Sequence, residues 1–187
     1  MKKKGSFPEQ IKYLKQVDSL LTTAVSDAKN DFHQFVLGSN NNGDTELRTV
    51  VLRKWSLKRQ SILFHTDIRS PKITQLKSCP TFSILFYSKK ERLQLRFKAS
   101  THIHYQDKVS EYCLNKTTES QKKCCQFSLA PSSEIKDNTK EVYAARTKSK
   151  KIDIQHDFSA IVCNFYELDV LFLNHKGQQR LLYKWNK

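Results

Sequence analysis

The residues with the clearest chemical potential form one short segment, Thr66-Asp67-Ile68-Arg69-Ser70-Pro71-Lys72, which follows a strand-like run over residues 60–65. Ser70 is a favoured N-cap residue and Pro71 a favoured first residue of a helix, so a strand is predicted to lead into a helix start here. The N–H groups and partial positive charge of a helix start attract anions. Arg69 and Lys72 add two cations, and Ser70 adds a hydroxyl. The segment is therefore predicted to hold a phosphate group.

A second polar pattern lies upstream, at Arg48-Thr-Val-Val-Leu-Arg53. Side chains alternate along a strand, so Arg48, Val50 and Leu52 would share one face and the residues between them the other. An arginine at the start of a strand can reach a phosphate, and the backbone beyond it offers donors and acceptors to a flat heterocycle. Further along, the amide of Gln94 could bond a ring carbonyl or imide. Together these residues predict a phosphate end, a ring slot and an amide anchor.

Composition restricts the class of protein. The chain has 187 residues, of which 38% are hydrophobic and 11% aromatic, which is typical of one folded domain. No apolar run reaches the roughly 20 residues that a membrane helix needs. The basic segment Met1–Lys4 is not followed by an apolar stretch, so we do not read it as a signal peptide. We expect a soluble, cytoplasmic protein.

The net charge of +15 raises the possibility of nucleic-acid binding. The lysines, however, are spread over the whole chain, and no finger, RNA-recognition or K-homology signature is present. A solvated basic surface is therefore the favoured interpretation, and a basic nucleic-acid-binding module stays as the alternative.

Metal, disulfide and nucleophile chemistry find little support. The five cysteines contain no C-x-x-C, and the adjacent pair Cys124-Cys125 does not have zinc-ligand spacing, so reduced thiols are expected. His102-Ile-His104 could place two imidazoles on one strand face, but no third ligand lies at a suitable spacing, so no metal site is predicted. No Ser/His/Asp or Cys/His pattern stands out, and no catalytic residue is assigned.

The elements that position these residues follow from hydrophobic periodicity. Apolar residues at helical spacing predict a leading helix within residues 1–30. Residues 32–105 should form a barrel core, because strand-like runs there follow one another with short polar links. The predicted strands are Phe32–Leu37, Leu47–Trp55, Ser61–Thr66, Thr81–Tyr87 and Arg92–Tyr105, with a turn cluster at residues 38–44 and a short helix from Pro71 to about Ser78.

The remainder of the chain divides in two. Residues 107–148 are polar and predict a helical insertion of two or three short helices. Closing strands return over residues 159–185, at Ser159–Tyr166, Val170–Leu173 and Arg180–Trp185. We expect a single domain over residues 1–187, mainly β, built as an antiparallel β-barrel with inserted helices.

Four motifs, in this order and spacing, resemble the pyridoxamine 5'-phosphate oxidase superfamily. They are Arg48–Arg53, Leu63–Thr66, Asp67–Lys72 and Leu93–Arg96. The resemblance is strongest over residues 46–100 and closest to a branch of uncharacterised oxidase-like flavoproteins, with a weaker match at Arg180–Tyr183. It implies an FMN-binding split β-barrel of the antiparallel Greek-key type. It also implies non-covalent FMN, usually at the interface of a homodimer.

The resemblance assigns roles to individual residues. By position, the FMN phosphate would be held by Arg48, Arg69, Ser70 and Lys72. The ring would be lined by Val50, Val51, Leu52 and Arg53, with backbone contacts to its pyrimidine edge. His65 and Thr66 would lie beside the ring, Gln94 would reach the flavin from a neighbouring strand, and Arg180 matches a late arginine that contacts FMN.

The chain departs from the family at the substrate end. Family oxidases carry Arg-Leu-His-Asp shortly before the late arginine, where this chain has His175-Lys-Gly-Gln-Gln179. The family's Tyr/Arg/Ser set for the substrate phosphate has no clear match in Glu111–Phe127. We therefore predict an FMN-dependent oxidoreductase with an unknown substrate and without the vitamin B6 site. A non-catalytic flavin-binding or storage protein is the alternative, and a deazaflavin or haem ligand stays open.

Overall fold

The computed structural model describes residues 7–122, 130–132, 154–174 and 177–186. The strands are β1 (Gln34–Asn41), β2 (Asp44–Val51), β3 (Lys54–Ser56), β4 (Ser61–Asp67), β5 (Thr81–Ser88), β6 (Leu93–Tyr105), β7 (Phe158–Phe172) and β8 (Gln179–Lys184). The described helices are α1 (Phe7–Ser26), α2 (Pro71–Ser78), α3 (Lys108–Lys116), α4 (Glu119–Lys122) and α6 (Ile154–Asp157), and a 3-10 turn covers Asp31–His33.

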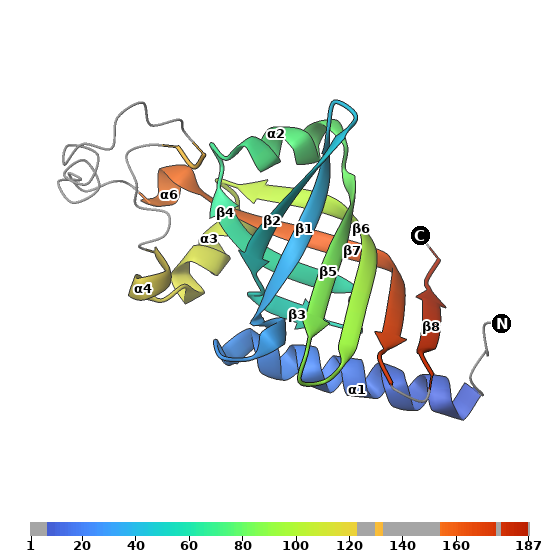
Figure 1. Cartoon of the computed structure of the whole chain (residues 1–187). Helices are drawn as coiled ribbons and strands as arrows, with labels where there is room; N and C mark the ends of the chain where they lie inside the picture. Colours follow the sequence, from blue (N-terminus) through green and yellow to red (C-terminus); the bar gives the residue numbers. More distant parts are fainter. Residues whose placement is uncertain (1–6, 123–129, 133–153, 175–176, 187) are drawn as a thin grey trace, which may run out of the picture.

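The strands of the described residues form one sheet in the order β2-β1-β5-β6-β7-β4-β3, with β8 beside β7. Every pairing is antiparallel. The sheet curls into a barrel, with α1 across one end and α2 at the other (Figure 1). The predicted fold class, a mainly β antiparallel barrel with added helices, is confirmed.

The long strand β7 divides the sheet. Along one edge it pairs with β6 over almost its whole length, from Ser159 to Phe172. Along the other edge its first half pairs with β4 and its second half with β8. A register shift between Lys98 and Ala99 of β6 bends the ladder at this point, as β-bulges do. The two strands predicted over residues 159–173 are therefore one continuous strand.

The opposite side of the barrel is open. The path of strands ends at β2 and β3, and in the described residues no ladder joins β2 to β4. The strand predicted over Leu47–Trp55 is interrupted at Leu52 and Arg53. Their N–H groups donate to the carbonyls of His33 and Leu63, each at 2.8 Å, and so carry the chain across to β4.

Local turns account for the remaining differences in the first half of the chain. The predicted turn over residues 38–44 is narrower, because β1 continues to Asn41. Asn42 and Gly43 make the reversal with φ values of 53° and 100°, as the two central residues of a tight hairpin do. Of the predicted insertion, α3 and α4 are described, and residues 123–129 and 133–148 lie outside the described residues.

Aromatic packing around Phe165 fills the barrel. Its ring stacks on Trp55 at 5.2 Å between centroids and meets Phe97 at 5.1 Å and Trp185 at 5.3 Å. Trp55 also donates its indole N–H to Asp18 of α1 at 2.7 Å, which ties the leading helix to the barrel. None of the described helices is long and apolar enough to cross a membrane.

We expect Phe165→Ala to lower the free energy of unfolding by about 3–5 kcal/mol, because it empties the centre of this cluster. Urea unfolding followed by tryptophan fluorescence would measure the change. Ile11→Ala, at a side chain of α1 that is 40% exposed, is the control and should cost far less. Similar losses in both variants would contradict the central place of Phe165.

Candidate functional site

The predicted strand-to-helix corner is present. β4 ends at Asp67, and α2 begins at Pro71 with Ser70 as its N-cap residue. The Ser70 hydroxyl makes no capping bond; it instead accepts from the Lys72 ammonium at 2.5 Å. The same ammonium donates to the hydroxyl of Thr66 at 3.1 Å. One cation and two hydroxyls therefore meet at the start of α2.

Arg48 of β2 comes close to this corner across the open side of the barrel. The pKa of Lys72 is lowered, first by burial and then by the positive charge of Arg48, while Asp67 opposes the shift. The Arg48 guanidinium also donates to Gln75 of α2 at 2.8 Å and to Ser39 of β1. Two cations that raise each other's electrostatic energy favour an anion beside them, and the surrounding hydroxyls suit a phosphate.

Glu46 completes this corner, and sequence reasoning missed it. Its carboxylate lies 2.8 Å from the Arg48 guanidinium and accepts from the Gln75 amide at 2.9 Å. Asn41 donates to its other oxygen at 2.6 Å. Hydrogen bonds from Gln75 and Asn41 are the main reasons that the pKa of Glu46 is lowered. An acid two residues before an arginine on a strand lies on the same face, and that spacing was the available signal.

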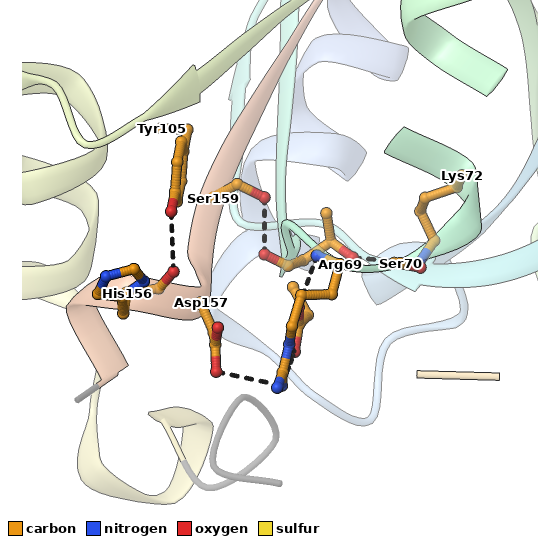
Figure 2. A network of polar contacts seen from close by, with 9 residues as sticks. Arg69, Ser70, Lys72, Tyr105, His156, Asp157 and Ser159 are labelled. Atoms are coloured by element: carbon orange, nitrogen blue, oxygen red, sulfur yellow. Dashed lines mark hydrogen bonds and ion pairs between the residues drawn. The ribbon is translucent and has the colours of Figure 1, made fainter. Parts of the chain in front are cut away.

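Arg69 is directed elsewhere. Its guanidinium pairs with Asp67 at 2.6 Å and with Asp157 at 3.1 Å. Figure 2 shows the Arg69 side chain reaching Asp157 while Lys72 lies on the other side of Ser70. The structure therefore brings Arg48, Ser70 and Lys72 together but sends the charge of Arg69 toward two carboxylates.

A cavity of about 580 Å³ lies on the other face of β4. His65 and Arg53 line it, and consecutive residues of a strand face opposite ways, so His65 and Thr66 serve different sides of one strand. The cavity is walled by sheet residues, by Val25 and by α3, and its lining includes the cations Arg53, Lys54, Arg59 and Lys116. We call the group of Arg48, Ser70 and Lys72 the phosphate corner. It and the cavity are linked at the end of β4, where His65 lines the cavity and the next residue, Thr66, contacts Lys72.

His65 is a neutral group at ordinary pH. Burial, followed by the positive charge of Arg53, lowers its pKa from 6.5 to about 4. Its ring meets Phe158 edge-on at 4.7 Å between centroids. His65 therefore offers the cavity an uncharged ring with one donor and one acceptor nitrogen.

The remaining residues assigned to the ring have mixed environments. Leu52 is fully buried in the core, and Val50 packs against the same core. Val51 is half-buried near the end of β2. Since the N–H groups of Leu52 and Arg53 already bond protein carbonyls, these two N–H groups are not available to a flavin edge.

Gln94 and Arg180 lie away from the corner within one chain. Gln94 is on β6, which β1 and β5 separate from β2, and Arg180 is on β8, beside the second half of β7. Arg180 lines a groove of about 430 Å³ on the outer face of the sheet. Asp169 accepts from Arg180 at 2.7 and 2.5 Å and also binds Arg96. Burial opposes ionisation of Asp169, but the hydrogen bonds of both arginines lower its pKa.

Two further cavity residues come from α3. Tyr112 and Lys116 are four residues apart, which places them on one helix face, and both line the cavity beside His65. The Lys116 ammonium lies 6.0 Å from the centroid of the Tyr112 ring. They belong to the segment in which the family's Tyr/Arg/Ser set had no clear match. Their i, i+4 spacing was the signal that could have identified them.

Comparisons with known proteins agree with this architecture. Residues 14–105 match the family model of the pyridoxamine 5'-phosphate oxidase, FMN-binding domain. A pyridoxamine 5'-phosphate oxidase-related, FMN-binding protein from Nostoc punctiforme superimposes with a TM-score of 0.72 at 19% identity, covering 92% of this chain and 91% of that one. The chain has the pyridoxamine 5'-phosphate oxidase-like split-barrel fold. The resemblance predicted from the sequence motifs is confirmed.

Other split barrels are similar over most of their length. PhzG from Burkholderia lata, in complex with tetrahydrophenazine-1-carboxylic acid, has a TM-score of 0.66 at 14% identity, covering 95% of this chain and 87% of that one. A protein related to general stress protein 26 from Clostridium acetobutylicum has a TM-score of 0.59 at 14% identity, covering 92% and 94%. No curated protein sequence matches the chain.

The donor set of this split barrel fits FMN, the cofactor of the matched domain family. A terminal phosphate suits Arg48, Lys72 and the hydroxyls of Thr66 and Ser70. A planar ring suits the cavity bordered by Arg53 and His65. The fit rests on these residues and does not require Arg69.

The pH dependence of the free energy of unfolding should reflect the lowered pKa of His65. Because its pKa in the folded chain is about 4 rather than 6.5, the unfolded chain binds more protons between these values. The contribution of neutral His65 to stability should be full above about pH 6.5 and be lost as the pH falls toward 4. Unfolding free energies of wild type and His65→Gln, measured from pH 7 to 4, should diverge in slope. Parallel curves, or an NMR midpoint of His65 near 6.5, would contradict this.

Proposed function

We propose that the protein is an FMN-binding flavoprotein that acts as a flavin-dependent oxidoreductase. The observation that carries the proposal is the convergence of Arg48 and Lys72 at the start of α2, next to a cavity on the other face of β4. Bound FMN would supply hydride or electron transfer. The chain would bind it, orient its ring and limit access of water.

The proposed cofactor contacts follow the geometry. Arg48, Lys72 and the hydroxyls of Thr66 and Ser70 would hold the phosphate. The ring would pass the end of β4 towards Arg53 and His65. The charge of Arg69 is shared by Asp67 and Asp157, so we assign Arg69 to holding the corner on the start of β7.

The cavity supports an anionic, planar substrate. Arg53, Lys54, Arg59 and Lys116 supply positive charge around an interior that also contains Tyr112. An aromatic ring carrying an acid group would satisfy both features. PhzG, which shares the fold, was captured with an acid of this kind. The sequence of α3 would set the identity of the substrate.

A homodimer would bring Gln94 and Arg180 to the flavin. These residues lie on strands that the fold keeps apart from the Arg48–Lys72 corner, so a second copy of the chain is the economical way to join them. Leu47 and Leu182, which are 69% and 53% exposed, add apolar surface on the strands that flank this outer face. The described cysteines are free thiols, which supports the cytoplasm as the proposed location.

The visible spectrum and FMN affinity test the proposal. Wild type should bind FMN, and Arg48→Ala and Lys72→Ala should each weaken it about ten- to a hundredfold, because each loses a charge-assisted bond to phosphate. Arg69→Ala is the matched control and should change FMN affinity much less while lowering stability. Riboflavin, which lacks the phosphate, should bind all four proteins alike.

A protein that takes up no FMN would overturn the proposal. If FMN binds but NAD(P)H and other donors fail to reduce it under anaerobic conditions, the storage alternative replaces the oxidoreductase.

Hybrid dimers test whether two chains share one site. Lys72→Ala and Arg180→Ala homodimers should both bind FMN weakly. A dimer of one Lys72→Ala chain and one Arg180→Ala chain, isolated through two different tags, should regain tight binding at one of its two sites. The reason is that one site then receives Lys72 from one chain and Arg180 from the other, both unaltered. Weak binding at both sites of the hybrid would show that each site uses a single chain. Elution of the wild-type protein only as a monomer in size-exclusion chromatography would exclude the dimer.

A further inference from the structure

The phosphate corner already contains an anion. The Glu46 carboxylate is 2.8 Å from the Arg48 guanidinium and shares Gln75 with it, since Gln75 accepts from Arg48 through its oxygen and donates to Glu46 through its nitrogen. In the described residues Lys72, by contrast, has hydroxyl partners and no carboxylate within ion-pair distance. One of the two cations of the corner is therefore neutralised from inside the protein.

Glu46 is placed to be displaced without unfolding. Its side chain is 42% exposed, whereas that of Arg48 is 18% exposed. Asn41, the residue directly before the tight turn at Asn42 and Gly43, holds the Glu46 side chain across the β1–β2 hairpin. A rotation of the Glu46 side chain into solvent would break its bonds to Arg48, Gln75 and Asn41, and leave the β1–β2 ladder unchanged.

The charges at the corner favour one class of ligand. Arg48, Lys72 and Glu46 sum to about one positive charge, and a phosphate monoester carries close to two negative charges at neutral pH. Such a dianion can bind both cations and compete with a single carboxylate for Arg48. A phosphodiester or carboxylate, with one negative charge, has no electrostatic advantage over Glu46.

We propose that Glu46 is a specificity-determining residue of the phosphate corner: it occupies Arg48 until a dianionic phosphate monoester displaces it. This rests on the proposed FMN function for the identity of the monoester, but the competition itself concerns only Arg48 and phosphate. Glu46 thereby weakens binding of all phosphates somewhat and disfavours singly charged groups. The corner is selective for dianions because Glu46 already neutralises part of its positive charge.

Glu46→Gln tests the competition, because glutamine keeps the shape and loses the charge. It should bind FMN about two- to fivefold more tightly than wild type, the size expected for removing a partly exposed ion pair. Riboflavin affinity should not change. Glu91→Gln is the matched control, since Glu91 is an exposed acid on the β5–β6 turn at the other end of the barrel. It should leave both affinities at the wild-type values.

A second readout does not need FMN. Melting temperatures of wild type, Glu46→Gln and Glu91→Gln are measured in sodium chloride and in sodium phosphate at equal ionic strength. Inorganic phosphate should raise the melting temperature of Glu46→Gln more than that of the other two proteins. Arg48→Ala added to Glu46→Gln should remove the extra stabilisation.

The outcomes separate this proposal from the proposed function. If FMN binds wild type and Glu46→Gln equally, and phosphate stabilises both equally, the competition is refuted while FMN binding stands. If no protein binds FMN but phosphate favours Glu46→Gln, the competition stands and the cofactor assignment fails. If neither ligand distinguishes the variants and FMN does not bind, both are refuted.

Discussion

The rest of the architecture depends on the divided pairing of β7. This strand supports β4 with its first half and β8 with its second half, and the register shift opposite Lys98 and Ala99 of β6 falls between the two halves. Since one continuous strand supports both, the end of β4 is fixed relative to the barrel core around Phe165. The gap between β2 and β4 remains open because the sheet ends at β2 and β3. The polar corner at α2 fills the edge of this gap.

The two cations that flank Ser70 are compensated in different ways. Burial and Arg48 make a protonated Lys72 costly, yet hydroxyls rather than carboxylates surround its ammonium. Arg69, two residues away from Asp67, is by contrast neutralised twice. The same short segment thus contains one cation that pairs with carboxylates of the protein and one that contacts hydroxyls. Sequence type alone does not separate these two uses.

Much of this could be read from the sequence. The Ser-Pro signal located the start of α2 at Pro71, and side-chain alternation placed Arg48 and Val50 on one face of β2. The break of the predicted strand at Leu52 and Arg53 could not be foreseen, because it arises from hydrogen bonds to His33 and Leu63, distant in sequence. The fusion of the last two predicted strands has a similar cause, since β6 imposes pairing across residues of low strand preference.

The side-chain partners were the least predictable part of the site. Arg69 was assigned to a phosphate from its place in a motif, and Asp157, which draws its charge away, lies 88 positions later in the chain. Glu46 and Tyr112 were overlooked for a different reason. Each belongs to a local pair, Glu46 with Arg48 on β2 and Tyr112 with Lys116 on α3, and only the folded chain shows that these pairs lie at the corner and at the cavity. Motif spacing predicted the corner of Arg48, Ser70 and Lys72, whereas only tertiary contacts revealed the carboxylates that pair with Arg48 and Arg69.

The insertion after β6 leaves and rejoins the sheet at adjacent points, because Tyr105 pairs with Ser159. A segment whose two ends are already neighbours can change in length or sequence at little entropic cost to the strands that carry it. The wall of the cavity formed by α3 belongs to this segment, whereas the corner of Arg48 and Lys72 does not. The fold is therefore modular in an evolutionary sense: one part can diverge to accept new molecules while the other stays under separate selection.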